Sequence, residues 1–188
     1  MSDRDQTGFV STSVDVVHSW AMFRLLRRTI RGPRGDLFER TFVSTPGAVG
    51  VVAITADNQL ILVSQYRSTF DDYVLEIPAG MRDIEGEEPA TTAGRELAEE
   101  TGFVAHHIER LGSCLSSPGI TDSVVELFLA RDVSVGLSMP EGPEEQEMKV
   151  VLVAFPEALA MVDFGLITDA KSTCGILLAA RRCNDLGM

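Results

Sequence analysis

Residues 80–103 read GMRDIEGEEPATTAGRELAEETGF, and this stretch predicts a helix with an unusual concentration of carboxylates. The segment 88–101 is the clearest helix of the chain, because Pro89 suits a first helical turn and Gly102 suits the residue after the last one. Only Arg95 offsets the six glutamates between residues 85 and 100, which are Glu85, Glu87, Glu88, Glu96, Glu99 and Glu100.

The spacing of these glutamates places several carboxylates on one side of the helix. Glu96 and Glu100 are four residues apart and share a face, with Glu99 beside them. Like charges at this spacing destabilise a helix by roughly a few tenths of a kcal/mol, and the helix dipole disfavours anions near the C-terminal end. Carboxylate oxygens are ligands that Mg²⁺ and Mn²⁺ prefer. The alternative is a solvated acidic face, the usual environment of such a cluster.

The pattern around this helix predicts an α/β domain with a mixed β-sheet, helices on both sides of the sheet, and a small β-rich arm in front. We expect the arm at residues 1–45 and the domain at 46–188. In the arm, residues 20–30 suit either a strand or a helix, GPRGD at 32–36 is a turn, and Phe38, Arg40 and Phe42 share a strand face. In the domain we expect a hairpin from residues 48–55 and 59–67, strands at 73–78, 108–115, 123–132 and 148–155, and a last helix from Asp169 to Cys183 capped by Thr168.

Composition limits the classes of partner and compartment. The formal net charge is −12, which argues against nucleic acid, because phosphate binding depends on Lys and Arg. A phosphorylated small molecule can still bind where metal ions and a few arginines invert the charge locally. The chain begins with a polar segment and contains no apolar run near the ~20 residues that span a bilayer. Its three cysteines lie far apart, which predicts a reduced, cytoplasmic protein that binds neither zinc nor membranes.

The order of residues in this stretch resembles the Nudix box, G-x5-E-x7-R-E-U-x-E-E-x-G-U, where U is apolar. Every specified position is filled from Glu87 onward, and the one departure is six residues instead of five between Gly80 and Glu87. The chain is therefore similar to the Nudix hydrolase superfamily, which implies an α/β/α sandwich. The resemblance implies a divalent cation, Mg²⁺ with Mn²⁺ able to substitute, and Arg95 paired with Glu87. Its metal ligands would be Glu96, Glu99, Glu100 and the backbone carbonyl of Ala79.

Sequence outside the box resembles the ADP-ribose pyrophosphatase branch of that superfamily. The matching features are Gln65-Tyr66-Arg67, LEIPAG at 75–80, and Pro118 fifteen residues after Phe103. They imply that Arg67 binds a phosphate and that Glu76 binds a ribose or a metal-bound water, although Pro118 alone fits an ordinary turn equally well. The expected reaction is hydrolysis of ADP-ribose to AMP and ribose 5-phosphate. Two alternatives stay open. The first is a Nudix hydrolase of another nucleoside diphosphate sugar or dinucleotide. The second is a non-catalytic ADP-ribose sensor, although such sensors tend to lose the box glutamates.

The resemblance also implies roles for the arm and for one loop. In this branch the arm is exchanged in a homodimer, and Arg40, with Phe38 or Phe42, would stack on the adenine of the partner's substrate. The alternative is that these phenylalanines are ordinary core residues. The general base usually lies in a loop after the sheet, and the acidic segment 139–148 supplies the candidates Glu145, Glu144 and Glu147, in that order. Acidic loops are usually only solvated, so this role is a hypothesis.

Overall fold

The computed structural model describes residues 8–136 and 147–185, and the chain divides into two compact units. The first unit comprises residues 1–46 with 117–123, and the second comprises residues 47–116 with 124–188. A segment from the middle of the chain thus belongs with the N-terminal strands, which the sequence did not predict. None of the helices in the described ranges is long and apolar enough to cross a membrane.

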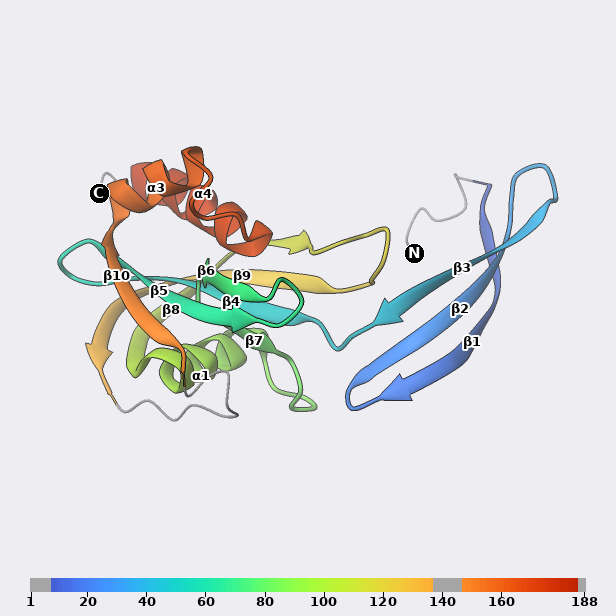
Figure 1. Cartoon of the computed structure of the whole chain (residues 1–188), viewed down its shortest axis with the longest axis horizontal. Coiled ribbons are helices and arrows are strands. Elements are labelled where there is room, and N and C mark those ends of the chain that lie inside the picture. Colours follow the sequence, from blue (N-terminus) through green and yellow to red (C-terminus); the bar gives the residue numbers. More distant parts are fainter. Residues whose placement is uncertain (1–7, 137–146, 186–188) are drawn as a thin grey trace. The chain divides into compact units, whose positions relative to one another are not determined.

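The first unit is an antiparallel sheet of strands β1 (Val10–Trp20), β2 (Phe23–Arg31) and β3 (Leu37–Ser44), in that order (Figure 1). The ambiguous stretch at 20–30 is therefore mostly strand, because β2 has a hydrogen-bonding partner on each side. The predicted turn at 32–36 is confirmed: the N–H of Gly32 donates to the carbonyl of Asp36 at 2.8 Å. Residues 117–123 join β3 through Val43, whose N–H donates to the carbonyl of Ile120 at 2.8 Å.

The second unit is built on a seven-stranded mixed sheet with the order β10-β5-β4-β9-β8, in which β6 pairs with β5 and β7 with β4. The central strands β4 and β9 are parallel and the other pairs are antiparallel. The strands are β4 (Ala48–Ile54), β5 (Gln59–Arg67), β6 (Asp72–Glu76), β7 (Ala79–Met81), β8 (Phe103–Leu115), β9 (Val124–Val135) and β10 (Lys149–Ala154).

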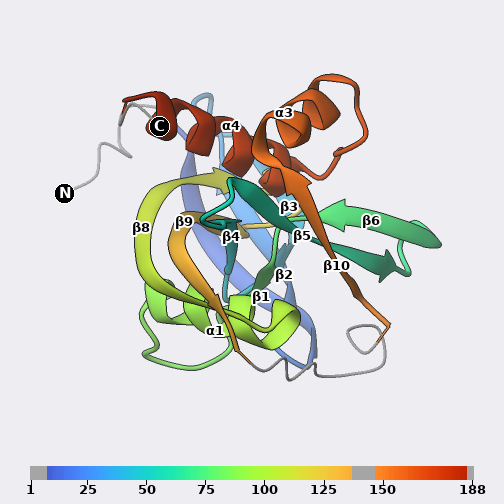
Figure 2. The ribbon, with the colours of Figure 1, turned by 90° about the vertical axis from the view of Figure 1, so that its left-hand side faces the viewer.

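Helices cover both faces of this sheet. Helix α1 (Pro89–Thr101) lies on one face, and α3 (Phe155–Asp163) and α4 (Ala170–Asp185) lie on the other (Figures 1 and 2). The predicted α/β/α sandwich with a mixed sheet is therefore confirmed. Helix α3 was not predicted, although Pro156 in its first turn is a helix-start signal.

Strand β4 shows why the sheet has a core on each face. Val49, Val51 and Ala53 pack with Ala93 and Leu97 of α1, whereas Val52 and Ile54 pack with Ile176 and Ala179 of α4. A strand that is buried on both faces requires apolar residues at successive positions, which explains the sequence AVGVVAI. The predicted packing face of α1 is right at Ala93, Leu97 and Thr101, which are buried, and wrong at Ala90, which is exposed in the first turn.

Candidate active site

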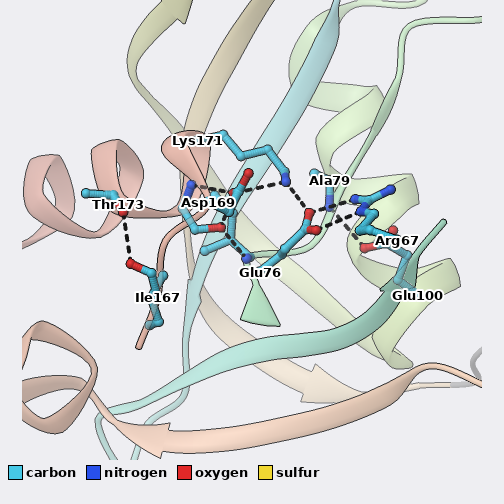
Figure 3. Close-up of polar contacts among 10 residues, drawn as sticks. Arg67, Glu76, Ala79, Glu100, Ile167, Asp169, Lys171 and Thr173 are labelled. Atoms are coloured by element: carbon cyan, nitrogen blue, oxygen red, sulfur yellow. Dashed lines mark hydrogen bonds and ion pairs between the residues drawn. The ribbon is translucent and has the colours of Figure 1, made fainter. Parts of the chain in front are cut away.

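Helix α1 begins and ends where the local sequence predicts. It follows Glu88, has Pro89 in its first turn, and ends at Gly102, whose φ of 72° is left-handed and therefore suits glycine. These ends place Glu96, Glu99 and Glu100, the three box glutamates that lie on the helix, in its last two turns. Glu100 is buried, and its Oε2 accepts the N–H of Ala79 on β7 at 3.0 Å (Figure 3). The helix is thereby attached to the strand that precedes the box loop.

Gly80 brings a second box glutamate close to the same strand. A Cβ on Gly80 would lie 1.9 Å from the carboxyl carbon of Glu96. Only a residue without a side chain leaves this space, so the carboxylate of Glu96 lies against the backbone of β7. The adjacent residue on that strand is Ala79, which binds Glu100. Glu96, Glu100 and Ala79 are therefore gathered at one place.

Arg95 is the one cation at the centre of several carboxylates. Its Nη1 lies 2.8 Å from Glu99 Oε2 and 2.9 Å from Glu96 Oε1, and its Nη2 lies 3.4 Å from Glu87 Oε2. The predicted pairing with Glu87 is confirmed, whereas the contacts with the two box glutamates were not predicted. Burial by itself lowers the pKa of Arg95, but the hydrogen bond with Glu87 and the charges of Glu96 and Glu99 outweigh it and raise that pKa.

The oxygen donors of this cluster fit a hard divalent cation. Within residues 8–136 and 147–185, no three His, Cys, Asp or Glu side chains already converge as a metal site, and Glu96 and Glu99 bind Arg95. Carboxylates nevertheless outnumber cations in this cluster, and Glu96 and Glu100 both contact β7. Oxygen is also the ligand atom that Mg²⁺ and Mn²⁺ prefer. The ligand set of Ala79, Glu96, Glu99 and Glu100 remains a prediction.

A second charged cluster joins β5, β6 and α4. Arg67 binds the carboxylate of Glu76 with two hydrogen bonds, from Nε at 2.7 Å and from Nη2 at 2.6 Å. Lys171 donates to the same carboxylate, and also to Asp169 at 3.0 Å. Glu76 is only 3% exposed. Burial raises its pKa, but the contacts with Arg67 and Lys171, which are drawn in Figure 3, outweigh the burial. The pKa therefore lies below its ordinary value and the carboxylate stays charged.

The start of α4 is held by Asp169, so the prediction of Thr168 as the cap is wrong. Asp169 directly precedes the first helical residue, and its Oδ2 accepts the N–H of Ser172 at 2.9 Å and the hydroxyl of Ser172 at 2.5 Å. Thr168 lies one residue too early for this bond to the helix N–H groups. The hydroxyl of Ser172, which is fully buried, also accepts the N–H of Ile77 at 2.8 Å. This chain of bonds connects α4 to the end of β6.

A cavity of about 490 Å³ opens beside the second cluster, with Arg67, Glu76, Asp169 and Lys171 in its wall. It adjoins the box, because Ala79, three residues after Glu76, binds Glu100, and Arg67 lies beside Glu100 (Figure 3). A larger cavity of about 570 Å³ is lined by Ile54, Phe155 and Leu159 together with Arg131 and Asp132, and by no residue of the box. We assign the chemistry to the smaller cavity, because it combines paired charges with the neighbouring box.

The remaining predicted site residues lie elsewhere. Arg40 is exposed on β3, with its guanidinium carbon 4.9 Å from the ring centroid of Phe38, and Pro118 lies in an exposed turn. Both belong to the first unit, whereas Arg67, Glu76 and the box belong to the second. Glu147 is exposed just before β10. Glu144 and Glu145 lie outside the described residues.

Sequence reasoning missed Lys171 and Asp169. Their signal was weak, because a lysine in the first turn of a helix is usually solvated, and Glu76 is 95 residues away. The sequence did contain one indication: Thr168 and Asp169, which can both cap a helix, shortly precede Lys171, one of only two lysines in the chain.

The fold and this geometry agree with comparisons to known proteins. Residues 44–173 match the NUDIX domain family. The chain belongs to this family. It is 38% identical over 144 residues to the ADP-ribose pyrophosphatase of Bacillus subtilis (strain 168), covering 77% of each chain. It is 34% identical over 170 residues to the ADP-ribose pyrophosphatase of Mycobacterium tuberculosis (strain ATCC 25618 / H37Rv), covering 90% of this chain and 82% of the relative.

A solved structure supports the same assignment at the level of the fold. The crystal structure of an ADP compounds hydrolase superposes on this Nudix protein with a TM-score of 0.79 at 22% identity, covering 95% of this chain and 96% of the other. The resemblance inferred from the box is therefore confirmed by the family match, by the relatives and by the fold.

Proposed function

We propose that this Nudix protein hydrolyses the diphosphate bond of ADP-ribose to AMP and ribose 5-phosphate. The observation that carries the proposal is the position of the Arg67–Glu76 pair and its cavity beside Glu100 of the box (Figure 3). An arginine next to a carboxylate-rich site is suited to a phosphorylated substrate that arrives with a cation. The two relatives named ADP-ribose pyrophosphatase support this substrate class.

Glu96, Glu99, Glu100 and the carbonyl of Ala79 would hold a divalent cation, Mg²⁺ by preference and Mn²⁺ as a substitute. When bound, such a cation neutralises the diphosphate and makes water more acidic. Arg67 binds a phosphate oxygen of the substrate, and Glu76 orients Arg67 through its two hydrogen bonds. Arg95 holds the box loop against α1 through Glu87.

A glutamate of the loop before β10 would take the proton from the attacking water, with Glu145 favoured over Glu144 and Glu147. Replacing each in turn by Gln separates them. The base should lose roughly 10²–10⁴-fold in kcat with little change in KM, because it acts mainly in the transition state. The solvated neighbours should change within a few-fold. Uniformly mild effects would move the role to Glu99.

Residues 1–45 would pack across a two-fold homodimer interface and bring Arg40 and Phe38 to the adenine, while residues 46–188 form the hydrolase domain. The support is that every residue of β1 is exposed, including the apolar Val14, Val16 and Trp20. So small a sheet has little core of its own. Light scattering at micromolar concentration should show a dimer. A fully active monomer would contradict this assembly.

Product analysis is the direct test of the proposed function. With Mg²⁺, the purified chain should convert ADP-ribose to AMP and ribose 5-phosphate with a higher kcat/KM than for GDP-mannose, UDP-glucose or diadenosine polyphosphates. Faster turnover of any of these would favour the alternative Nudix hydrolase. Tight binding of ADP-ribose without turnover would favour the sensor.

A further inference from the structure

Two of the three cysteines of the chain meet where helix α4 packs on strand β8. Cys114 lies on β8 and Cys174 on α4, and both are partly buried against the same apolar cluster of the second unit. The thiol of Cys114 forms a hydrogen bond with Cys174. The two sulfur atoms are therefore neighbours in the fold, although the residues are far apart in the sequence.

The spacing of residues along the helix and the strand explains this meeting. Cys174 and Leu178 are four residues apart on α4 and share a face, about 6 Å apart along the helix axis. Gly112 and Cys114 share a face of β8 and are about 7 Å apart. A Cβ on Gly112 would lie 3.4 Å from Cδ1 of Leu178. Because the two spacings match, the contact of Leu178 with Gly112 brings Cys174 over Cys114.

Small residues allow the helix to approach the sheet closely at this point. A Cβ on Gly175 would lie 3.0 Å from Cγ2 of Val52 and 3.2 Å from Cδ1 of Ile77, and Ala179, one turn further along, is fully buried. A disulfide requires two Cβ atoms about 4 Å apart, so it can join a helix to a sheet only where the backbones come close. The position of Cys174, next to Gly175, fulfils this condition.

The ordinary explanation is that both thiols are only small apolar side chains of the core. Cys114, however, also lines the cavity of about 490 Å³ beside Arg67, so a small oxidant reaches its sulfur without unfolding of the chain. Burial raises the pKa of the Cys114 thiol, and the charge and hydrogen bond of Cys174 raise it further. The thiol of Cys114 is therefore protonated near neutral pH, and the pair stays reduced until an oxidant is present.

We propose that Cys114 and Cys174 form a modification site, at which a small peroxide produces a reversible disulfide that ties α4 to β8. The ionised sulfur of Cys114 attacks one oxygen of the peroxide, the O–O bond breaks, and a sulfenic acid and hydroxide result. The ionised sulfur of Cys174 then attacks the sulfur of Cys114, the S–O bond breaks, and a second hydroxide leaves as the S–S bond forms. The protons of the two thiols convert both hydroxides to water. Two thiols are thus oxidised and one peroxide is reduced, independently of any substrate of the enzyme.

The test is a map of disulfides in the full chain after treatment with hydrogen peroxide at mildly alkaline pH, where more of the thiol is ionised. Trypsin places each cysteine in a peptide of its own, namely 111–131, 172–181 and 183–188. After alkylation of the remaining free thiols, peptide 111–131 should be linked to peptide 172–181, and dithiothreitol should separate them. A link to peptide 183–188, a link between two chains, oxidation of Cys114 without a link, or three free thiols would each overturn the inference.

Variants and thermal unfolding show whether the link forms within the native packing. Cys183→Ala is the matched control, because Cys183 is buried further along the same helix, and it should form the same link. Cys114→Ser and Cys174→Ser should form none. Because the link closes a long loop of chain, peroxide should raise the Tm of the wild type by roughly 5 °C or more relative to that of equally treated Cys174→Ser. This comparison removes the effect of methionine oxidation.

An equal or lower Tm of the linked wild type would contradict a disulfide within the native packing. If a serine variant fails to fold, the peptide map of the wild type and of Cys183→Ala still decides between this pair and any other.

Discussion

The two charged clusters of the second unit differ in how their positive and negative side chains balance. Around Arg95, one cation faces four carboxylates, those of Asp83, Glu87, Glu96 and Glu99. Around Glu76, two cations face two carboxylates, and each charge has a partner of the opposite sign. The difference indicates that the box requires positive charge from outside, whereas the second cluster is complete before any ligand arrives.

Burial follows the same division at two of the three glutamates of the box helix. The side chain of Glu76 is 4% exposed, compared with 13% for Glu96 and 22% for Glu99. A carboxylate can be buried so deeply only when its charge is matched, because an unpaired buried charge is very costly. Glu96 and Glu99 keep access to solvent, and therefore to a cation, whereas Glu100 is buried at 6% exposure and accepts the N–H of Ala79. Substitutions in the two clusters should consequently affect different properties.

The largest effect is expected from the box. Glu96→Gln or Glu100→Gln should fold and yet lose more than about 100-fold in kcat/KM, since loss of an outer-shell partner alone costs roughly 10–100-fold. Mg²⁺ affinity, measured by calorimetry, should fall in parallel. The control is Glu85→Gln, an exposed carboxylate of the same segment. Near wild-type turnover in either box variant would exclude these residues as ligands.

The second effect is on stability, in addition to the loss of the support that Glu76 gives to Arg67. Glu76→Gln should lower the free energy of unfolding at pH 7 by about 3 kcal/mol, because it removes one partner of a buried ionic cluster. The pKa of Glu76 is lower in the fold than its ordinary value of 4.5, so its stabilisation is present above pH 4.5 and is lost as pH falls through the lower folded pKa. Urea denaturation at pH 7 and pH 3.5 should show a smaller pH dependence in the variant. An unchanged pH dependence would show that Glu76 contributes nothing through its charge.

A smaller effect tests the close approach of Glu96 to β7. In Gly80→Ala the new Cβ displaces a carboxylate at the end of a flexible side chain, so the fold should persist while Glu96 moves. Mg²⁺ affinity should fall about tenfold, the lower end of the cost of disturbing a ligand's support. Gly119→Ala, where a Cβ meets nothing within 4 Å, is the control. Unaltered metal affinity would mean that this approach does not position the ligand.

The smallest effect concerns the link between α4 and β6. Ser172→Ala leaves the buried N–H of Ile77 without its acceptor, which should cost about 1 kcal/mol of stability or slightly more. The kcat for ADP-ribose should stay within about twofold, because Ser172 contacts neither cation. Thermal unfolding and steady-state kinetics measure the two quantities. A tenfold loss of kcat with unchanged stability would contradict the separation of the two clusters.

Local signals were sufficient for the box. Pro89 and Gly102 predicted both ends of α1, because a first-turn proline and a left-handed glycine act within a few residues. The pairing of Glu87 with Arg95 followed from the motif. The missed helix α3 and the wrong cap at Thr168 show the limit of such signals, since a one-residue shift decides which side chain reaches a helix N–H.

The sequence by itself determined the family, the acidic helix, the run of central strands and the chemical type of the box ligands, since each depends on residues close together in the chain. Only the tertiary structure decided that Lys171 shares Glu76 with Arg67, and that Ser172 binds Ile77, across 95 residues in each case. The physical reason is that such contacts require the sheet and both helix layers to be packed before the groups can meet.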